Sequence, residues 1–246
     1  MEISLSVDSY KGVDGSSLST TRCSQMIQVF EMLEEMGDTL TSYIDIQEIA
    51  FRKKLFGNTQ AKSAIRTFFP LLKKIHFVNY EGHFPANRCF TELGTQFVLA
   101  CRALSNVTDD TPNKEEIILR LNRIKQSAQK QGLINMCNDP EWKSHNMLVA
   151  LKLLKELKVL HWNEFLYTLH CLESGETIED SIDRIRKNKA YIDSIIFLNE
   201  DREVLPNTCY SYLRSFLEEA GLISKVSSME SKLLESSDMF FSQINI

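Results

Sequence analysis

One short run of the sequence has the residue types of a metal-dependent nuclease site. In the run DPEWK, Asp139 precedes Glu141 and Lys143, and such a site requires an acidic residue close to an E-x-K pattern on adjacent strands. The context differs, because no pair of strands is indicated here. Asp-Pro followed by Glu is typical of a helix start, where carboxylates lie near the positive end of the helix dipole. The sequence therefore favours a structural role for this run over catalysis.

Other catalytic and metal-binding patterns are missing from the sequence. It has no G-x-S-x-G, no glycine-rich phosphate loop, and no spacing that argues for a serine, a histidine and a carboxylate acting together. The cysteines lack any C-x-x-C pair and are spread over the chain: Cys23, Cys89, Cys101, Cys137, Cys171 and Cys209. We expect reduced, mostly buried thiols, no bound metal or cofactor, and no enzymatic activity unless the chain is a fragment of a nuclease.

The charged residues suggest a different chemistry, the neutralisation of phosphates. The net charge of -5 argues against a generic nucleic-acid binder. The charges are unevenly placed, however. Residues 45–102 carry nine Lys and Arg against four Asp and Glu, whereas residues 1–44 carry two against seven and residues 106–246 carry 17 against 22. One basic segment therefore lies inside an acidic protein.

Apolar residues spaced by three and four predict the helices around this segment. The pattern indicates a helix over 23–36, a second helix capped by Asp45 with Glu48 three residues later, and a third capped by Thr59. Pro70 lies inside the third pattern and removes a helical hydrogen bond, so we expect a kink or an early end there.

A hairpin and a further helix follow. The run HFVNYEGHFPANRCF alternates around Glu81-Gly82, as a β-hairpin does, and Thr91 begins a helix that extends through Leu104. Helix, short strand, helix, turn, helix, hairpin, helix is the element order of a winged helix-turn-helix, whose third helix reads the major groove of DNA.

This element order assigns DNA contacts to the basic segment. The residues expected to read the groove are Lys62, Ser63, Arg66 and Thr67. The residues expected to meet phosphates are Arg52, Lys53, Lys54, Lys73 and Lys74, with His83 and Arg88 acting from the wing. The alternative is that the same face is a solvated basic surface or docks on protein, because winged helices also serve as protein-docking modules.

The polar run 106–113 predicts a boundary between two domains. We expect a flexible lead-in over 1–20, a winged-helix domain over 21–106, and a second helical, winged-helix-like domain over 114–246. The fold class is therefore mainly α, with two tandem winged helix-turn-helix-like domains and small β-hairpin wings.

The expected second domain follows the same order of elements with less regular spacing. A helix over 114–131 should stop at Gly132, and a long helix over 177–196 would be an insertion. The last helix should bury Tyr212 and expose three weaker candidate DNA contacts, Tyr210, Ser211 and Arg214. The basic run on the long helix is expected to face water: Arg184, Arg186, Lys187 and Lys189.

Several pieces together resemble a known family. AKSAIRTFFPLLKKIHFVN, FTELGTQFV, WNEFLYTL, IEDSIDRIRKNKAYI and CYSYLRSFLEEAGLI, in this order, are similar to the recognition half of type IIS restriction endonucleases of the AlwI and BpuJI sort. The resemblance covers about residues 20–225. It implies tandem winged-helix domains that read an asymmetric DNA site, while a separate C-terminal domain cuts.

No cleavage domain follows Ile246 in this sequence, so three interpretations stay open. The chain could be a DNA-recognition fragment, a DNA-binding subunit of a restriction or defence system, or a relative that lost DNA contact. The third resembles the acidic tandem winged-helix subunits that dimerise and dock on the kleisin of bacterial chromosome-organising complexes. We expect double-stranded DNA as the partner, with a protein partner or a homodimer as the alternative.

The sequence also bears on location. It contains no run of ~18 or more apolar residues, and its first residues lack the basic flank and apolar centre of a signal peptide. We therefore expect a cytoplasmic protein without membrane contact.

Overall fold

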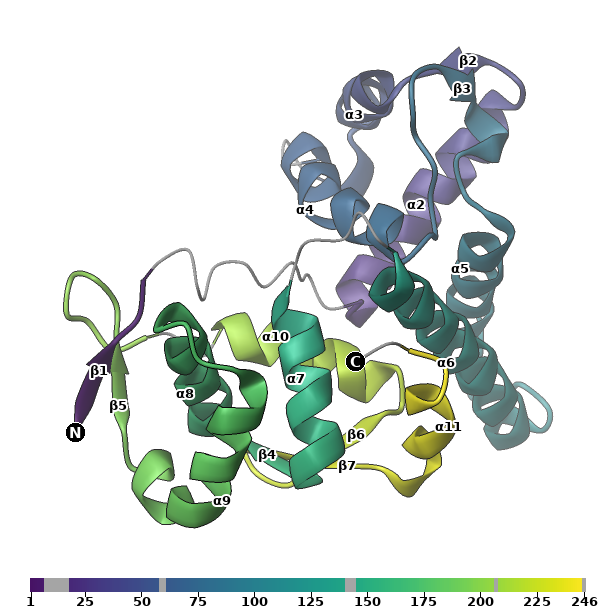
Figure 1. Cartoon of the computed structure of the whole chain (residues 1–246). Helices are drawn as coiled ribbons and strands as arrows, with labels where there is room; N and C mark the ends of the chain where they lie inside the picture. Colours follow the sequence, from purple (N-terminus) through teal and green to yellow (C-terminus); the bar gives the residue numbers. More distant parts are fainter. Residues whose placement is uncertain (7–17, 58–60, 140–144, 206–207, 245–246) are drawn as a thin grey trace. The chain divides into compact units, whose positions relative to one another are not determined.

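The computed structural model describes residues 1–6, 18–57, 61–139, 145–205 and 208–244 and is mainly helical over them (Figure 1). The chain divides into two compact units. We call Ser16–Asp139 the inserted unit, because in sequence it interrupts the other one. Met1–Gly15 together with Pro140–Ile246 form the host unit. No helix among the described residues is long and apolar enough to cross a membrane.

The prediction of a flexible segment over 1–20 is wrong for the first residues of the chain, which form a paired strand. Strand β1 (Glu2–Ser4) pairs in parallel with β5 (Ile196–Leu198), so that Ile3 lies opposite Phe197 and both side chains are buried. The backbone N–H of Ser6 also donates to Oε1 of Glu173 at 3.0 Å. A strand that pairs 194 positions away along the chain leaves no local sequence signal. Residues 7–17 lie outside the described part.

The inserted unit consists of helices around a minimal sheet. Its elements are α2 (Thr20–Met36), β2 (Leu40–Thr41), α3 (Tyr43–Arg52), η1 (Leu55–Gly57), α4 (Ala61–Lys74), β3 (Phe84–Pro85), η2 (Ala86–Arg88), α5 (Glu92–Ser105) and α6 (Lys114–Asn138). Ser19 and Thr91 cap α2 and α5 with their side chains, as such residues do at helix starts. The helices expected around 23–36 and from Thr91 to Leu104 are therefore confirmed, within a few residues at their ends.

The domain boundary expected at 106–113 is wrong. This run only connects α5 to α6, which pack against each other within the inserted unit. The expected stop at Gly132 is wrong too, because α6 continues to Asn138. A Cβ at Gly132 would lie 2.8 Å from the carbonyl oxygen of Ile75 and 3.0 Å from the ring of Phe77. Glycine therefore serves close packing here and does not end the helix.

The expected hairpin forms only in part. Val78 and Phe90 make a single antiparallel bridge, and the N–H of Asn79 donates to the carbonyl of Cys89 at 2.8 Å. Strand β3, however, pairs antiparallel with β2, so Thr41 lies opposite Phe84. The chain reverses at Gly82, which has a φ of 63°.

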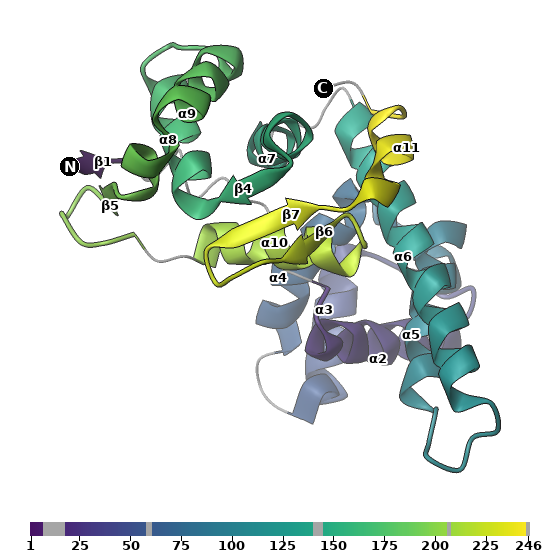
Figure 2. The same cartoon turned by 90° about the horizontal axis from the view of Figure 1, so that it is seen from below.

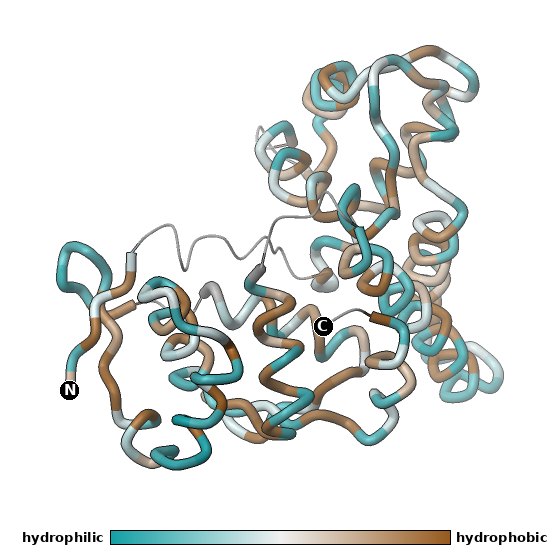
Figure 3. Tube along the Cα trace, viewed as in Figure 1, coloured by the Kyte–Doolittle hydropathy of each residue, from teal (hydrophilic) through white to brown (hydrophobic). Residues whose placement is uncertain are grey.

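The host unit combines helices with a three-stranded sheet. Its remaining elements are α7 (His145–Leu157), β4 (Val159–His161), α8 (Trp162–Glu173), α9 (Ile178–Asp193), α10 (Thr208–Glu219), β6 (Ile223–Lys225), β7 (Glu230–Leu233), η3 (Glu235–Ser237) and α11 (Asp238–Phe241). The strands are antiparallel in the order β4, β7, β6 (Figure 2). Hydrophobic and hydrophilic residues alternate along the helices (Figure 3), as helices with one buried face require.

Candidate nucleic-acid interface

The start of α3 is fixed by a capping box one turn earlier than expected. Ser42, rather than Asp45, is the N-cap, and its Oγ accepts a hydrogen bond from the N–H of Asp45. The Asp45 carboxylate in turn accepts from the Ser42 N–H at 3.0 Å and from its Oγ at 2.7 Å. These bonds stabilise the ionised carboxylate and so lower the pKa of Asp45. Helix α3 thus has a defined beginning.

A tight turn joins α3 to the segment before α4. Lys54, Phe56 and Gly57 all have positive φ angles, of 52°, 67° and 69°. The N–H of Phe56 donates to Oε1 of Gln28 at 3.0 Å, which ties the turn to α2. The expected cap at Thr59 lies outside the described residues.

Helix α4 continues through Pro70 to Lys74, so the early end is wrong, while the kink, the other expected effect of Pro70, stays a prediction. Ile65, Phe68, Phe69 and Leu72 are fully buried along its inner face. Burial of such side chains contributes about 1.5–3 kcal/mol each, which outweighs the ~3 kcal/mol that an internal proline costs. The opposite face exposes a stripe of Ser63, Arg66, Thr67 and Pro70.

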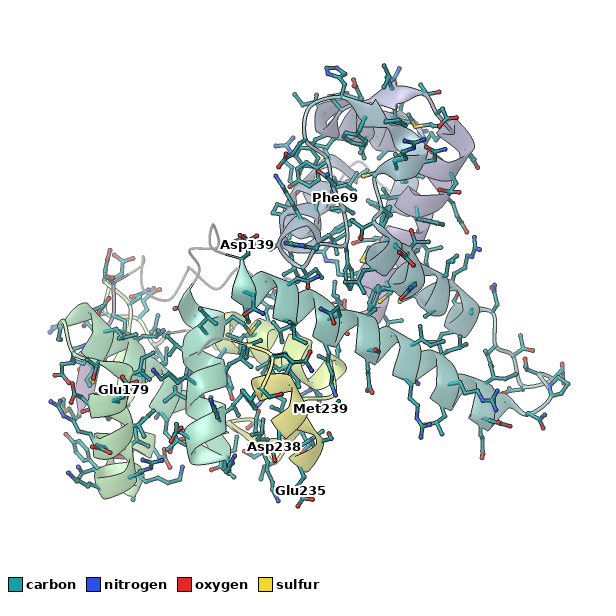
Figure 4. The ribbon with its side chains drawn as sticks, turned by 45° about the vertical axis from the view of Figure 1, so that its right-hand side comes forward. Phe69, Asp139, Glu179, Glu235, Asp238 and Met239 are labelled. Atoms are coloured by element: carbon teal, nitrogen blue, oxygen red, sulfur yellow. The ribbon has the colours of Figure 1, made fainter. Side chains whose placement is uncertain are left out.

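An aromatic cluster holds α3, α4 and the following loop together. Tyr43 and Tyr80 stack at 4.6 Å between ring centroids, and Phe69 lies 5.9 Å from Tyr43 and 5.8 Å from Tyr80. Phe69 projects into the inserted unit (Figure 4). Burial raises the pKa of both tyrosines, so neither phenol ionises at neutral pH. The cluster is a structural support for the exposed face of α4.

Three of the lysines expected to contact DNA form ion pairs within the unit. Lys53 pairs with Glu35 at 2.6 Å, and Lys73 pairs with Glu81 at 3.0 Å. Lys62 pairs with Glu48, and its Nζ also lies 4.9 Å from the centre of the Phe51 ring. The sequence count of nine cations against four acids overstates the free positive charge, because the tertiary structure brings acids such as Glu35 from α2 beside it.

Three other basic residues of this group face solvent: Arg52, Lys54 and Arg66. Arg52 and Lys54 are exposed at the end of α3, and neither makes an ion pair with any residue that the structure describes. Arg66 is exposed on α4, and its Nε donates to Oε1 of Gln47 at 3.0 Å. Lys74 is half-buried at the last position of α4. Arg52, Lys54 and Arg66 are the cations open to an anionic ligand on this side of the unit.

Arg88 lies on a different element from Arg52, Lys54 and Arg66. Arg88 is exposed in η2, which packs against α2, and it shares no hydrogen bond or ion pair with α3 or α4 in the described part of the chain. His83 is exposed near the start of α3, where its charge helps to lower the pKa of Asp45.

Of the three DNA contacts expected in the host unit, one is buried. Tyr210 is buried, with its ring 5.0 Å from Trp162 and 5.7 Å from Phe165, so its assignment as an exposed contact is wrong. Tyr212 is 48% exposed where burial was expected. The spacing of Tyr210, Leu213 and Leu217 by three and four carried the correct signal.

Arg214 has a structural task within the host unit. Its Nη1 donates to the carbonyl oxygens of Ser227 at 3.2 Å and Ser228 at 2.6 Å, in the turn between β6 and β7. Ser211 is half-buried on the same helix. Arg214 therefore fastens α10 to this turn rather than projecting toward a ligand.

The basic run on α9 is largely paired. Arg184 contacts Glu176 at 3.0 Å and Arg186 contacts Glu156 at 3.1 Å, with both arginine side chains half-exposed. Lys187 is exposed and makes no ion pair with a described residue. These residues form a solvated, internally neutralised surface.

The acidic residues, histidines and cysteines singled out in the sequence have these positions in the structure. No group of three or more His, Cys, Asp or Glu side chains within them could hold a metal ion. Five cysteines are buried and unbridged: Cys23, Cys89, Cys101, Cys137 and Cys171. Burial raises the pKa of Cys89 and of Cys137 to about 12. Asp139 lies 3.5 Å from Nε2 of His76, whereas Glu141 and Lys143 lie outside the described residues.

The two units differ sharply in charge. The inserted unit contains 15 Lys and Arg against 13 Asp and Glu, whereas the host unit contains 13 against 20. Net positive charge therefore belongs to the inserted unit, and Arg52, Lys54 and Arg66 are among its exposed cations. No protein-family model, no curated protein and no solved structure gives a significant match to this chain.

Proposed function

We propose that the inserted unit binds double-stranded DNA, with α4 in the major groove. The observation that carries the proposal is the exposed face of α4. This helix contains four basic residues and no carboxylate, and Ser63, Arg66 and Thr67 share its solvent-exposed stripe. Donors on short side chains beside an arginine are the groups that contact base edges and phosphates.

The order of the elements supports this proposal. In the inserted unit, α3 leads through a tight turn into α4, and β2 pairs with the strand that follows the reversal at Gly82. In the host unit, the order α7, β4, α8, α10, β6, β7 with the sheet order β4, β7, β6 is also that of a winged helix, with α9 and β5 inserted. Two such units in tandem are what the resemblance to type IIS recognition domains implies.

The contacts we propose are fewer than the sequence suggests. Arg66, Ser63 and Thr67 face the groove, while Arg52 and Lys54 meet phosphates at the end of α3. Lys53, Lys62 and Lys73 would first have to leave their carboxylate partners, so they contribute less. As the recognition part of a restriction or defence system, the chain would supply DNA binding alone.

A second function, docking on a protein partner or on a second copy of the chain, is favoured for the host unit. The host unit contains 13 basic and 20 acidic residues. Glu218 and Glu219 lie at the end of α10, the helix that would enter the major groove if this unit bound DNA as a winged helix does. Phosphates repel such a surface.

A salt titration tests the DNA proposal. Binding of the full chain to a random-sequence duplex, followed by fluorescence anisotropy, should weaken as salt rises, with a slope of log K against log salt of about −2 to −4. Arg52→Ala with Lys54→Ala should make that slope shallower by about 2. The matched control is Arg120→Ala with Arg123→Ala, which removes the same charge from the exposed face of α6 and should leave the slope unchanged. Absence of binding at low salt would refute the proposal.

A further inference from the structure

Gln47 and Arg66 form a polar link between α3 and α4 that packing alone does not require. Gln47 is only 8% exposed, yet both ends of its amide are used. Its Nε2 donates to the carbonyl of Tyr43 at 3.3 Å, and its Oε1 accepts from Nε of Arg66 at 3.0 Å. The amide is held by its own helix, so it offers a fixed acceptor to the arginine of the next one.

This link restricts the guanidinium without neutralising it. The planar group is anchored through Nε, which leaves Nη1 and Nη2 as donors. Neither nitrogen contacts a carboxylate in the part of the chain that the structure describes, and Glu48, which follows Gln47 in sequence, is engaged by Lys62. Arg66 therefore keeps its full charge, and less conformational freedom is lost when it binds a ligand.

The neighbours of Arg66 on α4 leave space around it. Ser63 lies one turn before it and Thr67 directly after it, and both are exposed with short side chains. The hydroxyl of Thr67 donates back to the carbonyl of Ser63 at 2.8 Å. Both side chains are shorter than that of Arg66, which is itself exposed to solvent.

We propose that Arg66 reads a guanine in the major groove, donating from its two Nη groups to O6 and N7, with Gln47 as its positioning residue. This inference rests on the proposed DNA binding and adds to it a specific base. Guanine presents two acceptors side by side in the major groove, and a fixed arginine fork matches that pair. An unanchored arginine would meet a phosphate equally well.

The first experiment identifies the base. A site is selected from randomised duplexes with the full chain, and each guanine in it is then replaced by 7-deazaguanine, which lacks the N7 acceptor. One replacement should weaken binding of the wild-type chain roughly 5-fold or more, and a G·C to A·T change there roughly 5- to 150-fold. Neither change should affect Arg66→Ala, because the contact is already lost.

Two further variants separate base reading from phosphate binding. Arg66→Lys keeps the charge but not the fork, so it should retain the salt slope and lose the guanine preference. Gln47→Met should lose the preference while its melting temperature and its affinity for random DNA stay at the wild-type values. Arg123→Ala is the control and should keep the preference.

The outcomes are distinct. If Arg66→Ala weakens all duplexes equally and the 7-deazaguanine effect persists, Arg66 contacts a phosphate and the inference is overturned. A guanine preference that survives in Arg66→Lys overturns the inference as well. Because Arg66 is exposed, this substitution leaves the packing of the core unchanged, so the variant folds as the wild type does. A wild-type chain that binds no duplex overturns the proposed function itself.

Discussion

Gly94 of α5 lies directly against the backbone of Phe77. A Cβ at Gly94 would be 2.0 Å from the carbonyl oxygen of Phe77 and 2.7 Å from its carbonyl carbon. The ring of Phe77 is fully buried and lies 5.0 Å from that of Phe97. The segment that follows α4 therefore packs directly on α5 at Phe77. Only a residue without a Cβ fits at position 94, so this packing requires glycine there.

Gly94→Ala should destabilise the inserted unit by at least about 3 kcal/mol, because the clash involves backbone atoms that cannot rotate away. The measurement is urea unfolding followed by circular dichroism. Thr95→Ala, at the next and half-exposed position, is the control and should stay within about 0.5 kcal/mol of wild type. An unchanged unfolding curve for Gly94→Ala would show that α5 can shift away from Phe77.

Arg214→Ala should destabilise the host unit by about 1–3 kcal/mol, because two carbonyl groups in the turn between β6 and β7 lose a charged donor. Trp162, whose ring is 5.0 Å from that of Tyr210 on the same helix as Arg214, provides the fluorescence signal. Lys187→Ala removes a cation from an exposed site and should change little. DNA affinity that falls with Arg214→Ala at unchanged stability would restore Arg214 as a ligand contact.

Lys189→Met should destabilise the host unit by about 1–3 kcal/mol. Glu164 is 1% exposed and pairs with Lys189 at 2.5 Å, while its Oε2 accepts from the N–H of His161 at 2.7 Å. Removing the lysine leaves a buried carboxylate with one donor, and the half-exposure of Lys189 moderates the cost.

The double variant Lys189→Met with Glu164→Gln tests the cause of this loss. It should recover much of the stability in urea unfolding, because the uncompensated charge is gone. Arg186→Met breaks a pair that is half-exposed on both sides and should cost no more than about 1 kcal/mol. Equal losses for the single and double variants would mean that packing of the Lys189 stem, and not its charge, stabilises the unit.

Two of the capping boxes, Ser42 with Asp45 at the start of α3 and Thr177 with Asp180 at the start of α9, predict a sensitivity to acid. Hydrogen bonds from Ser42 and Thr177 lower the pKa of Asp45 and of Asp180, respectively. A carboxyl whose pKa is lower in the folded chain contributes stability above its unfolded pKa, and that contribution is lost as pH falls through the folded pKa. Unfolding midpoints measured from pH 7 down to about 2 should therefore fall less steeply for Asp45→Asn and Asp180→Asn than for wild type. Asp110→Asn, in an exposed loop, should follow the wild-type curve.

Local signals in the sequence determined most helices of this protein. Thr91 and Thr177 cap the helices expected after them, and the apolar spacing over 23–36 falls within α2. These signals suffice because a helix forms from contacts three and four residues apart and from a cap beside its first turn. The mainly helical fold could be predicted for the same reason.

Only the tertiary structure decided which of these surfaces carry free charge and which residues are buried. Lys53 and Lys62 look available in the sequence, but folding brings Glu35 and Glu48 beside them. In the sequence, Gly132 predicts the end of a helix. In the structure, Ile75 and Phe77 occupy the space that a side chain at position 132 would need. In each case the deciding neighbour is distant in sequence or lies on another element, so its effect appears only when long-range packing places it.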